Sequence, residues 1–143
     1  MSWRFEGRLC VVVHSAKSPT NLEWQRFLKD AHEHSGSHMR ILVVSHGGGP
    51  DGDQRTQLAR TMSSAPAPTA VMTSSALVRG ISAAISFFNR KMKTVDLHDA
   101  EGAFGFLGLT ASERVKALQL RAHLENDLEV APPSVRRSAS MGR

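Results

Sequence analysis

The stretch with the most chemistry is a polar, glycine-rich run in the middle of the chain: Ser45-His46-Gly47-Gly48-Gly49-Pro50-Asp51-Gly52-Asp53-Gln54-Arg55. In some lipases and esterases a His-Gly-Gly-Gly string offers backbone amides to an oxyanion. Those hydrolases also need a serine inside a Gly-x-Ser-x-Gly string, and this chain has none. We therefore predict no catalytic residue and no enzyme. The glycines are interpreted as a sharp turn, because glycine adopts positive φ angles without a side-chain clash.

The same run follows an apolar strand-like segment and opens a helix. Open α/β sheets bind ligands at this position, and free amides at a helix start attract anions. Asp51 and Asp53, however, place two carboxylates there, which would cap the helix and repel a phosphate. No Walker lysine is present. The sequence predicts capping by Asp51 or Asp53. It leaves as the alternative function a small-molecule, nucleotide or anion binder, or an enzyme, that uses the Gly47–Gly49 loop and Arg79.

Histidines gather around residues 32–38, where His32, Glu33, His34 and His38 are of the types that bind zinc. On a helix His32 and His34 would point about 200° apart, and Gly36 would end the helix before His38 could share a face with His34. The spacing therefore predicts a solvated helix end, with no metal and no cofactor.

Arg79 departs from an apolar stripe formed by Leu77, Ile81, Ala84, Ile85 and Phe88. Such a stripe predicts a helix that packs on the core, with Arg79 toward solvent or a partner. Because this helix should begin beside the strand ends near residue 45, Arg79 is the second candidate binding residue after the loop.

Hydrophobic periodicity predicts the elements that position these residues. We expect a hairpin over 2–13, strands at 41–44, 69–73 and 93–97, and helices starting near residues 21, 51, 75, 99 and 111. Two Thr-x-x-Glu strings, at Thr20 and Thr110, have capping-box spacing, and Gly108 should end the short helix that Asp99 caps. Strands alternating with helices predict an α/β fold with a mixed sheet whose parallel part is covered by helices.

Composition bounds the domain organisation. The chain has 143 residues and a formal net charge of +5. We expect one domain over 1–130, with its last helix at about 110–128, and a basic tail at 131–143 that does not fold. Ser138 and Ser140 of that tail, with Ser45, are candidate phosphorylation sites.

Charge and cysteine content narrow the class of partner. Aromatic residues make up 6% of the chain and tyrosine is absent, which disfavours a nucleic-acid binder that stacks bases. One cysteine, Cys10, excludes an internal disulfide framework and predicts a reducing compartment. No apolar run reaches the roughly 20 residues that cross a bilayer, so we expect a cytoplasmic protein without a membrane partner.

The last helix carries a second apolar stripe, Val115, Leu118 and Ala122, which could join a partner or a second copy, or cover the sheet.

The order of these elements resembles the STAS domain, and in particular the SpoIIAA-like anti-sigma factor antagonists. The resemblance covers roughly residues 3–109 and rests on patterns: Phe5-Glu6-Gly7-Arg8-Leu9-Cys10-Val11-Val12, the strand 41–44, the strand 70–73, and the segment from Val95 to Leu107. It implies a STAS-like mixed sheet with an N-terminal hairpin and helices packed mainly on one face.

The resemblance also implies a function. Phosphorylatable members carry an Asp-Ser-Ser-Gly-like signature between the strand and the helix that correspond to the stretch Ser45–Arg55, and this chain has no hydroxyl residue at the matching helix start. The implied role is a non-enzymatic signalling or scaffold module that binds a protein partner. Its predicted binding residues are Ser45, His46, Gly47, Gly48, Gly49, Asp51, Asp53, Gln54, Arg55 and Arg79.

Overall fold

The computed structural model describes residues 1–34, 38–61, 67–88 and 91–130, apart from the side chains of 87, 88, 129 and 130. Its centre is a five-stranded sheet in the order β1-β2-β3-β4-β5. The strands are β1 (Ser2–Glu6), β2 (Leu9–His14), β3 (Arg40–Ser45), β4 (Thr69–Thr73) and β5 (Met92–Val95). β1 runs antiparallel to β2 and the other neighbours are parallel. The predicted α/β class, mixed sheet and N-terminal hairpin are confirmed.

Every residue of β2 is buried, as its run of apolar residues predicts. Val11 and Val13 face one hydrophobic core, whereas Cys10 and Val12 face a second core on the other side of the sheet. The hairpin before it turns at Gly7, whose φ of 58° is accessible to glycine at little cost.

The five helices are α1 (Asn21–Glu33), α2 (Gly52–Thr61), α3 (Ala76–Phe88), α4 (Ala100–Leu107) and α5 (Ala111–Val130). Both predicted capping boxes form: Thr20 with Glu23 at α1, and Thr110 with Glu113 at α5. The start and the end predicted for α4 are also confirmed. Asp99 caps its start, and Gly108 ends it in the left-handed conformation.

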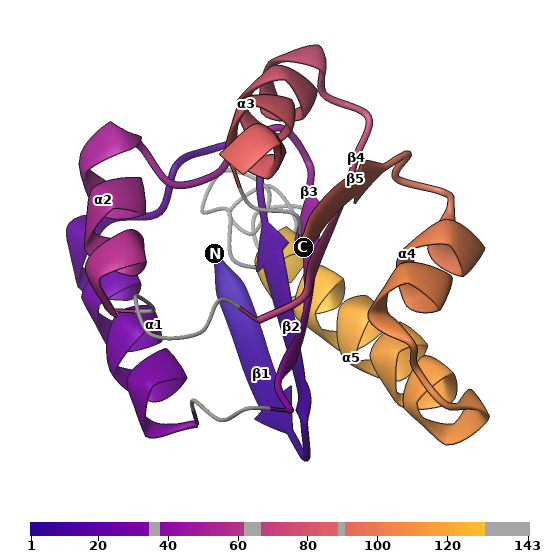
Figure 1. Ribbon diagram of the computed structural model, residues 1–143. Coiled ribbons are helices and arrows are strands. Elements are labelled where there is room, and N and C mark those ends of the chain that lie inside the picture. Colours follow the sequence, from indigo (N-terminus) through magenta and orange to yellow (C-terminus); the bar gives the residue numbers. More distant parts are fainter. Residues whose placement is uncertain (35–37, 62–66, 89–90, 131–143) are drawn as a thin grey trace, which may run out of the picture.

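The helices cover both faces of the sheet, not mainly one (Figure 1). α4 and α5 close the core that contains Leu9, Val11 and Val13, and α1 with α2 closes the other. Right-handed crossovers place the helices between parallel strands on a single side. The opposite face is equally apolar, so the two helices that follow β5 must cover it. α5 packs on β1 and β2.

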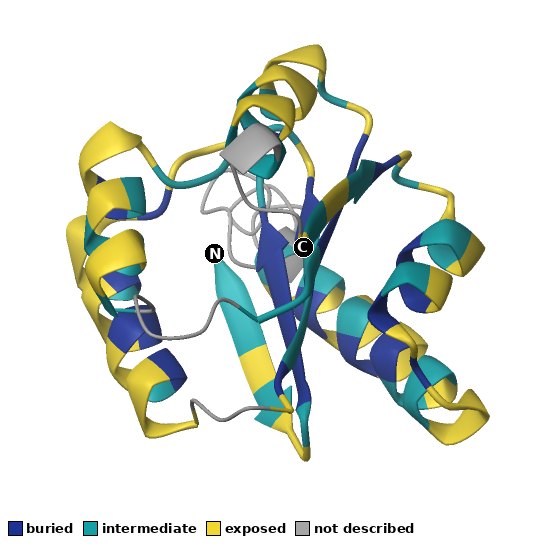
Figure 2. Ribbon diagram, viewed as in Figure 1, coloured by how far each residue is buried: buried dark blue, intermediate teal, exposed yellow. Residues whose placement is uncertain are grey.

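The apolar stripe predicted for α3 is only partly covered, which corrects that expectation. Leu77 is 70% exposed, Ala84 is exposed, and Ser82 is the buried residue among the described side chains of this helix. α3 packs against β4 and β5 at the end of the sheet where these strands finish (Figures 1 and 2). It contributes no residue to either hydrophobic core among the described residues.

Two predictions fall outside the described residues: the helix end at Gly36, and the tail 131–143 with Ser138 and Ser140. Among the residues that are described, no helix is both long and apolar enough to cross a bilayer.

Candidate functional site

Three polar residues form a buried row across the carboxyl ends of adjacent parallel strands. His14 pairs in register with Ser45, and Ser45 with Thr73. Their exposed fractions are 4%, 2% and 0%. Alternation along the strands directs all three toward the face covered by α1 and α2. The sequence singled out Ser45 alone, because the parallel register that aligns it with His14 and Thr73 is a tertiary property.

The two hydroxyls of this row fix the loops that leave the sheet. Ser45 Oγ donates to the carbonyl of Gly48 at 2.6 Å and accepts from the amide of Gly47 at 3.2 Å. Thr73 Oγ1 accepts from the amide of Ser75 at 3.1 Å. Ser45 is enclosed and its hydroxyl is used inside its own loop, so this structure does not present it to a kinase.

His14 is the unusual member of the row. Its Nδ1 is enclosed and has no hydrogen-bond partner. Burial lowers the pKa of His14 to about 4, so that the imidazole is neutral at pH 7. A buried polar atom without a partner costs free energy. The described residues therefore leave the hydrogen-bonding capacity of His14 Nδ1 unused.

The glycines of the loop have different tasks. Gly47 has a φ of 118°, which favours glycine, whereas Gly48 and Gly49 have no positive φ. Gly48 is needed for close approach instead: a Cβ there would overlap the carbonyl oxygens of Ser15 and Lys17. The amide of Gly48 donates to Ser15 O at 2.8 Å. The 15–17 segment and the glycine loop are thus packed directly on each other.

Asp51 caps α2, as one of the two predicted alternatives stated. Its carboxylate accepts from the amide of Gln54 at 2.8 Å, and the side chain of Gln54 accepts from the amide of Asp51 at 2.9 Å. Gln54 also donates to Pro19 O at 3.0 Å, while Trp24 donates to Gln54 O at 3.0 Å. Gln54 is therefore a buried connection between the starts of α1 and α2. It is not a contact residue in this conformation, and Asp53 remains exposed beside it.

Three charged residues at this end of the sheet, His46, Arg79 and Arg121, have carboxylate partners within the protein. His46 Nε2 lies 2.6 Å from the carboxylate of Glu125, which also accepts from Arg121 of α5 at 3.2 Å. Arg121 donates to Leu97 O at 3.1 Å, so α5 reaches across to the loop that follows β5. These α5 partners were missed in the sequence, since 79 positions separate His46 from Glu125.

Arg79 forms a second such connection. Its guanidinium donates to Thr73 O at 3.1 Å and to the carboxylate of Asp96 at 2.9 Å. Backbone and Arg79 contacts lower the pKa of Asp96, led by the hydrogen bond from the His98 amide. Arg55 likewise donates to Pro50 O at 2.8 Å. Arg79 is still half-exposed and lies at the same sheet edge as the loop, as predicted.

The structure thus divides the ten predicted binding residues by exposure. His46, Asp51, Asp53 and Arg79 are exposed, and Gly47, Gly49 and Arg55 are partly exposed. Ser45, Gly48 and Gln54 are enclosed and act within the fold.

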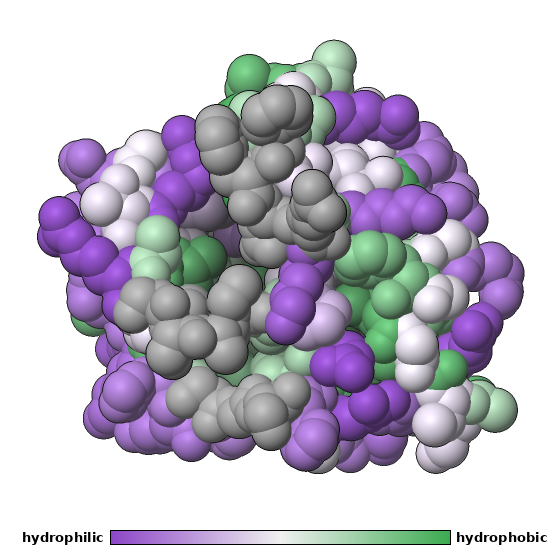
Figure 3. Space-filling view, in the orientation of Figure 1, coloured by the Kyte–Doolittle hydropathy of each residue, from purple (hydrophilic) through white to green (hydrophobic). Residues whose placement is uncertain are grey.

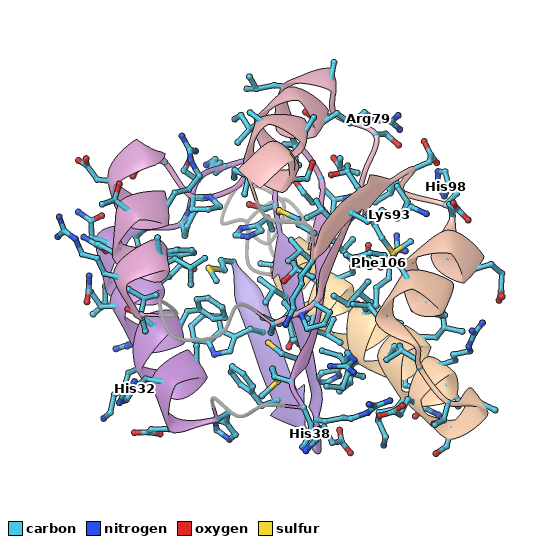
Figure 4. The ribbon with its side chains drawn as sticks, in the orientation of Figure 1. His32, His38, Arg79, Lys93, His98 and Phe106 are labelled. Atoms are coloured by element: carbon cyan, nitrogen blue, oxygen red, sulfur yellow. The ribbon has the colours of Figure 1, made fainter. Side chains whose placement is uncertain are left out.

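The histidines near residues 32–38 lie at the other end of the molecule. Figure 4 shows His32 and His38 far from Arg79 and His98. His34 stacks on Phe5, with ring centroids 4.4 Å apart. Within the described ranges, no three His, Cys, Asp or Glu side chains lie close enough to hold a metal ion.

Nothing at the candidate edge assembles a nucleophile with a base among the described residues. The hydroxyl of Ser45 contacts backbone atoms, and His46 pairs with a carboxylate on its Nε2. The arrangement is a pre-formed surface of mixed charge. No family model, curated protein or solved structure matches the chain, and the resemblance to the STAS domain therefore stays a prediction.

Proposed function

We propose that this protein is a non-enzymatic, STAS-like regulatory or scaffold module that binds a protein partner at the carboxyl edge of its sheet. The binding surface comprises the exposed part of the 45–55 loop, the first turn of α2 and Arg79. We place the module in the cytoplasm, with neither nucleic acid nor membrane as its partner at this surface.

One observation carries the proposal: the polar groups of this edge are fixed by contacts within the fold yet keep an exposed side. His46 is held by Glu125, Asp51 by the amide of Gln54, and Arg79 by Asp96. Such side chains lose little freedom when a partner arrives, which favours binding. Their mixed charge suits the rim of a protein interface better than a site for one small ion.

The test is a pull-down from lysate of the source organism, with the intact protein and two variants compared by mass spectrometry. Asp53→Lys reverses an exposed charge at this edge, and Glu33→Lys makes the same change at the exposed end of α1. We expect a specific partner to be retained by the intact protein and by Glu33→Lys but lost by Asp53→Lys. A partner retained equally by all three would show that the assigned surface is wrong.

The alternative is a small-molecule or nucleotide binder, and the enclosed Nδ1 of His14 is the observation that favours it. The loop amides argue against an anion at the glycines. The amides of Gly47, Gly48 and Asp51 donate within the protein, and the carboxylate of Asp51 stands at the same helix start. Thermal shift against nucleotides and phosphorylated metabolites separates the two functions, since a ligand at 100 times its Kd stabilises by about 2.7 kcal/mol.

A further inference from the structure

The imidazole of His14 is enclosed next to a loop that the backbone of the same segment holds. His14 is the last residue of β2, it is 4% exposed, and its Nδ1 has no partner among the described residues. The carbonyl oxygen of His14 accepts from the amide of His46 at 3.0 Å, and that of Ser15 accepts from the amide of Gly48 at 2.8 Å. Two consecutive residues therefore connect the enclosed ring to the glycine loop, residues 46–49.

Two charged groups act on the ring of His14, one at the start of the chain and one on α1. Burial is the main cause that lowers the pKa of His14; the α-amine of Met1 lowers it further, and Glu23 raises it. Both carboxylate oxygens of Glu23 are in use, because one lies 3.3 Å from that α-amine and the other accepts from the Thr20 amide at 2.9 Å. Ser45, the neighbour of His14 in register on β3, carries no charge. A protonated ring would therefore lack a free carboxylate among these neighbours.

The chain on either side of the connection borders solvent. Ala16, Lys17 and Ser18 are exposed, as is His46 at the start of the glycine loop. Figure 3 shows hydrophilic residues at the upper end of α2, the helix that the glycine loop leads into. Neither the 15–18 segment nor the glycine loop contributes a side chain to the two hydrophobic cores. Separating them breaks the hydrogen bonds of the His46 and Gly48 amides but leaves both cores packed, so water reaches the ring at a smaller cost than by unfolding the domain.

We propose that His14 is an acid-sensitive switch for the glycine loop: protonation of its ring releases the loop from the 15–18 segment while the rest of the sheet stays folded. Acid favours the open state because an imidazolium must be hydrated or paired, and the enclosed site provides neither. The glycine loop belongs to the surface proposed above for a protein partner. Resting on that proposed function, binding at this edge weakens as the pH falls below about 6.5.

Amide hydrogen exchange of the full chain, followed by NMR, tests the release. The reporters are the amides of His46 and Gly48, compared as protection factors so that the intrinsic effect of pH on exchange is removed. Since the pKa of His14 is about 4 when enclosed and 6.5 when free, the equilibrium constant for opening should rise about 20-fold from pH 7 to pH 5. The amide of Gly108, which donates to Gly105 O at the exposed end of α4, is the control and should change by less than about twofold. Amides in the middle of β2 should stay more protected than both reporters at each pH, because they need a larger opening.

Two substitutions separate His14 from the other titratable groups. His14→Met should abolish the change between pH 7 and pH 5, and His14→Gln takes its place if that variant does not fold. His46→Gln removes the exposed histidine of the loop and its contact with Glu125, and should retain the change. Reporters equally protected at both pH values, a change that persists without His14, or reporters as protected as the middle of β2 would each overturn the proposal. The measurement uses no partner, so its outcome does not depend on whether the assigned surface binds a protein.

Discussion

His46 and Glu125 meet at 2.6 Å although one leaves the third strand of the sheet and the other stands near the end of the last helix. The contact joins the candidate binding loop to α5, whose outer side carries the exposed side chains of Val115 and Leu118. Arg121 extends the connection to Leu97 O at the end of β5. The loop and the last helix are therefore in direct side-chain contact.

Among the polar residues of the loop region, Gln54 should be the one whose replacement lowers the free energy of unfolding most. Replacement by Ala removes the capping contact with the Asp51 amide and leaves Pro19 O without its donor in a buried place. We expect a loss of roughly 2–3 kcal/mol in the free energy of unfolding, measured by urea denaturation. Gln57→Ala, three residues along the same helix and only partly buried, should stay within about 0.5 kcal/mol of the intact protein. Equal losses for the two variants would contradict the role assigned to Gln54.

Gly48 and Gly49 should respond differently to the same substitution. A methyl group at position 48 overlaps backbone carbonyl oxygens of Ser15 and Lys17, whereas at position 49 it meets nothing within 4 Å. We expect Gly48→Ala to destabilise the fold by about 1–3 kcal/mol and Gly49→Ala to leave it unchanged or slightly more stable. Paired thermal melts check this, and a tolerant position 48 would show that the 15–17 segment is free to move.

Protonation of Glu113 should account for part of the stability that the fold loses at low pH. Its side-chain hydrogen bonds with Arg8 are the main cause that lowers the pKa of Glu113 from its ordinary 4.5 to about 2. Because the folded state holds the carboxylate ionised, this stability is present above about pH 4.5 and is lost as the pH falls toward 2. Glu113→Gln keeps the capping geometry but removes the charge, so the Tm of this variant should fall less steeply between pH 5 and pH 2. Glu101, whose side chain is 86% exposed, provides the control: Glu101→Gln should retain the slope of the intact protein.

Protonation of His14 should destabilise the folded state. Burial lowers its pKa from 6.5 to about 4, so the folded protein favours the neutral ring. The stability is full above about pH 6.5 and declines as the pH falls toward 4, by about 3 kcal/mol in total. His14→Met removes this dependence, while His123→Gln, at an exposed position of α5, should not. If the His14→Met melts kept the full slope between pH 6.5 and pH 4, burial of this imidazole would not be its source.

Local sequence was sufficient for most elements and their ends. Capping by Thr20, Asp51, Asp99 and Thr110 depends on contacts from each side chain to the backbone amide three residues later. The burial of β2 follows from its apolar run. Such signals act within one or two turns of the chain, where propensity and hydrogen-bond geometry decide the conformation. The α/β class followed from their order.

Tertiary structure alone decided which of these elements meet. The row of His14, Ser45 and Thr73 depends on the register between strands, and the pair of His46 and Glu125 depends on which face α5 covers. Periodicity also placed the stripe of α3 on the core, yet Leu77 is exposed. A hydrophobic period tells which residues of a helix share a side, but not whether that side finds a partner within its own domain. Whether that side is covered depends on which helices already pack on the two faces of the sheet.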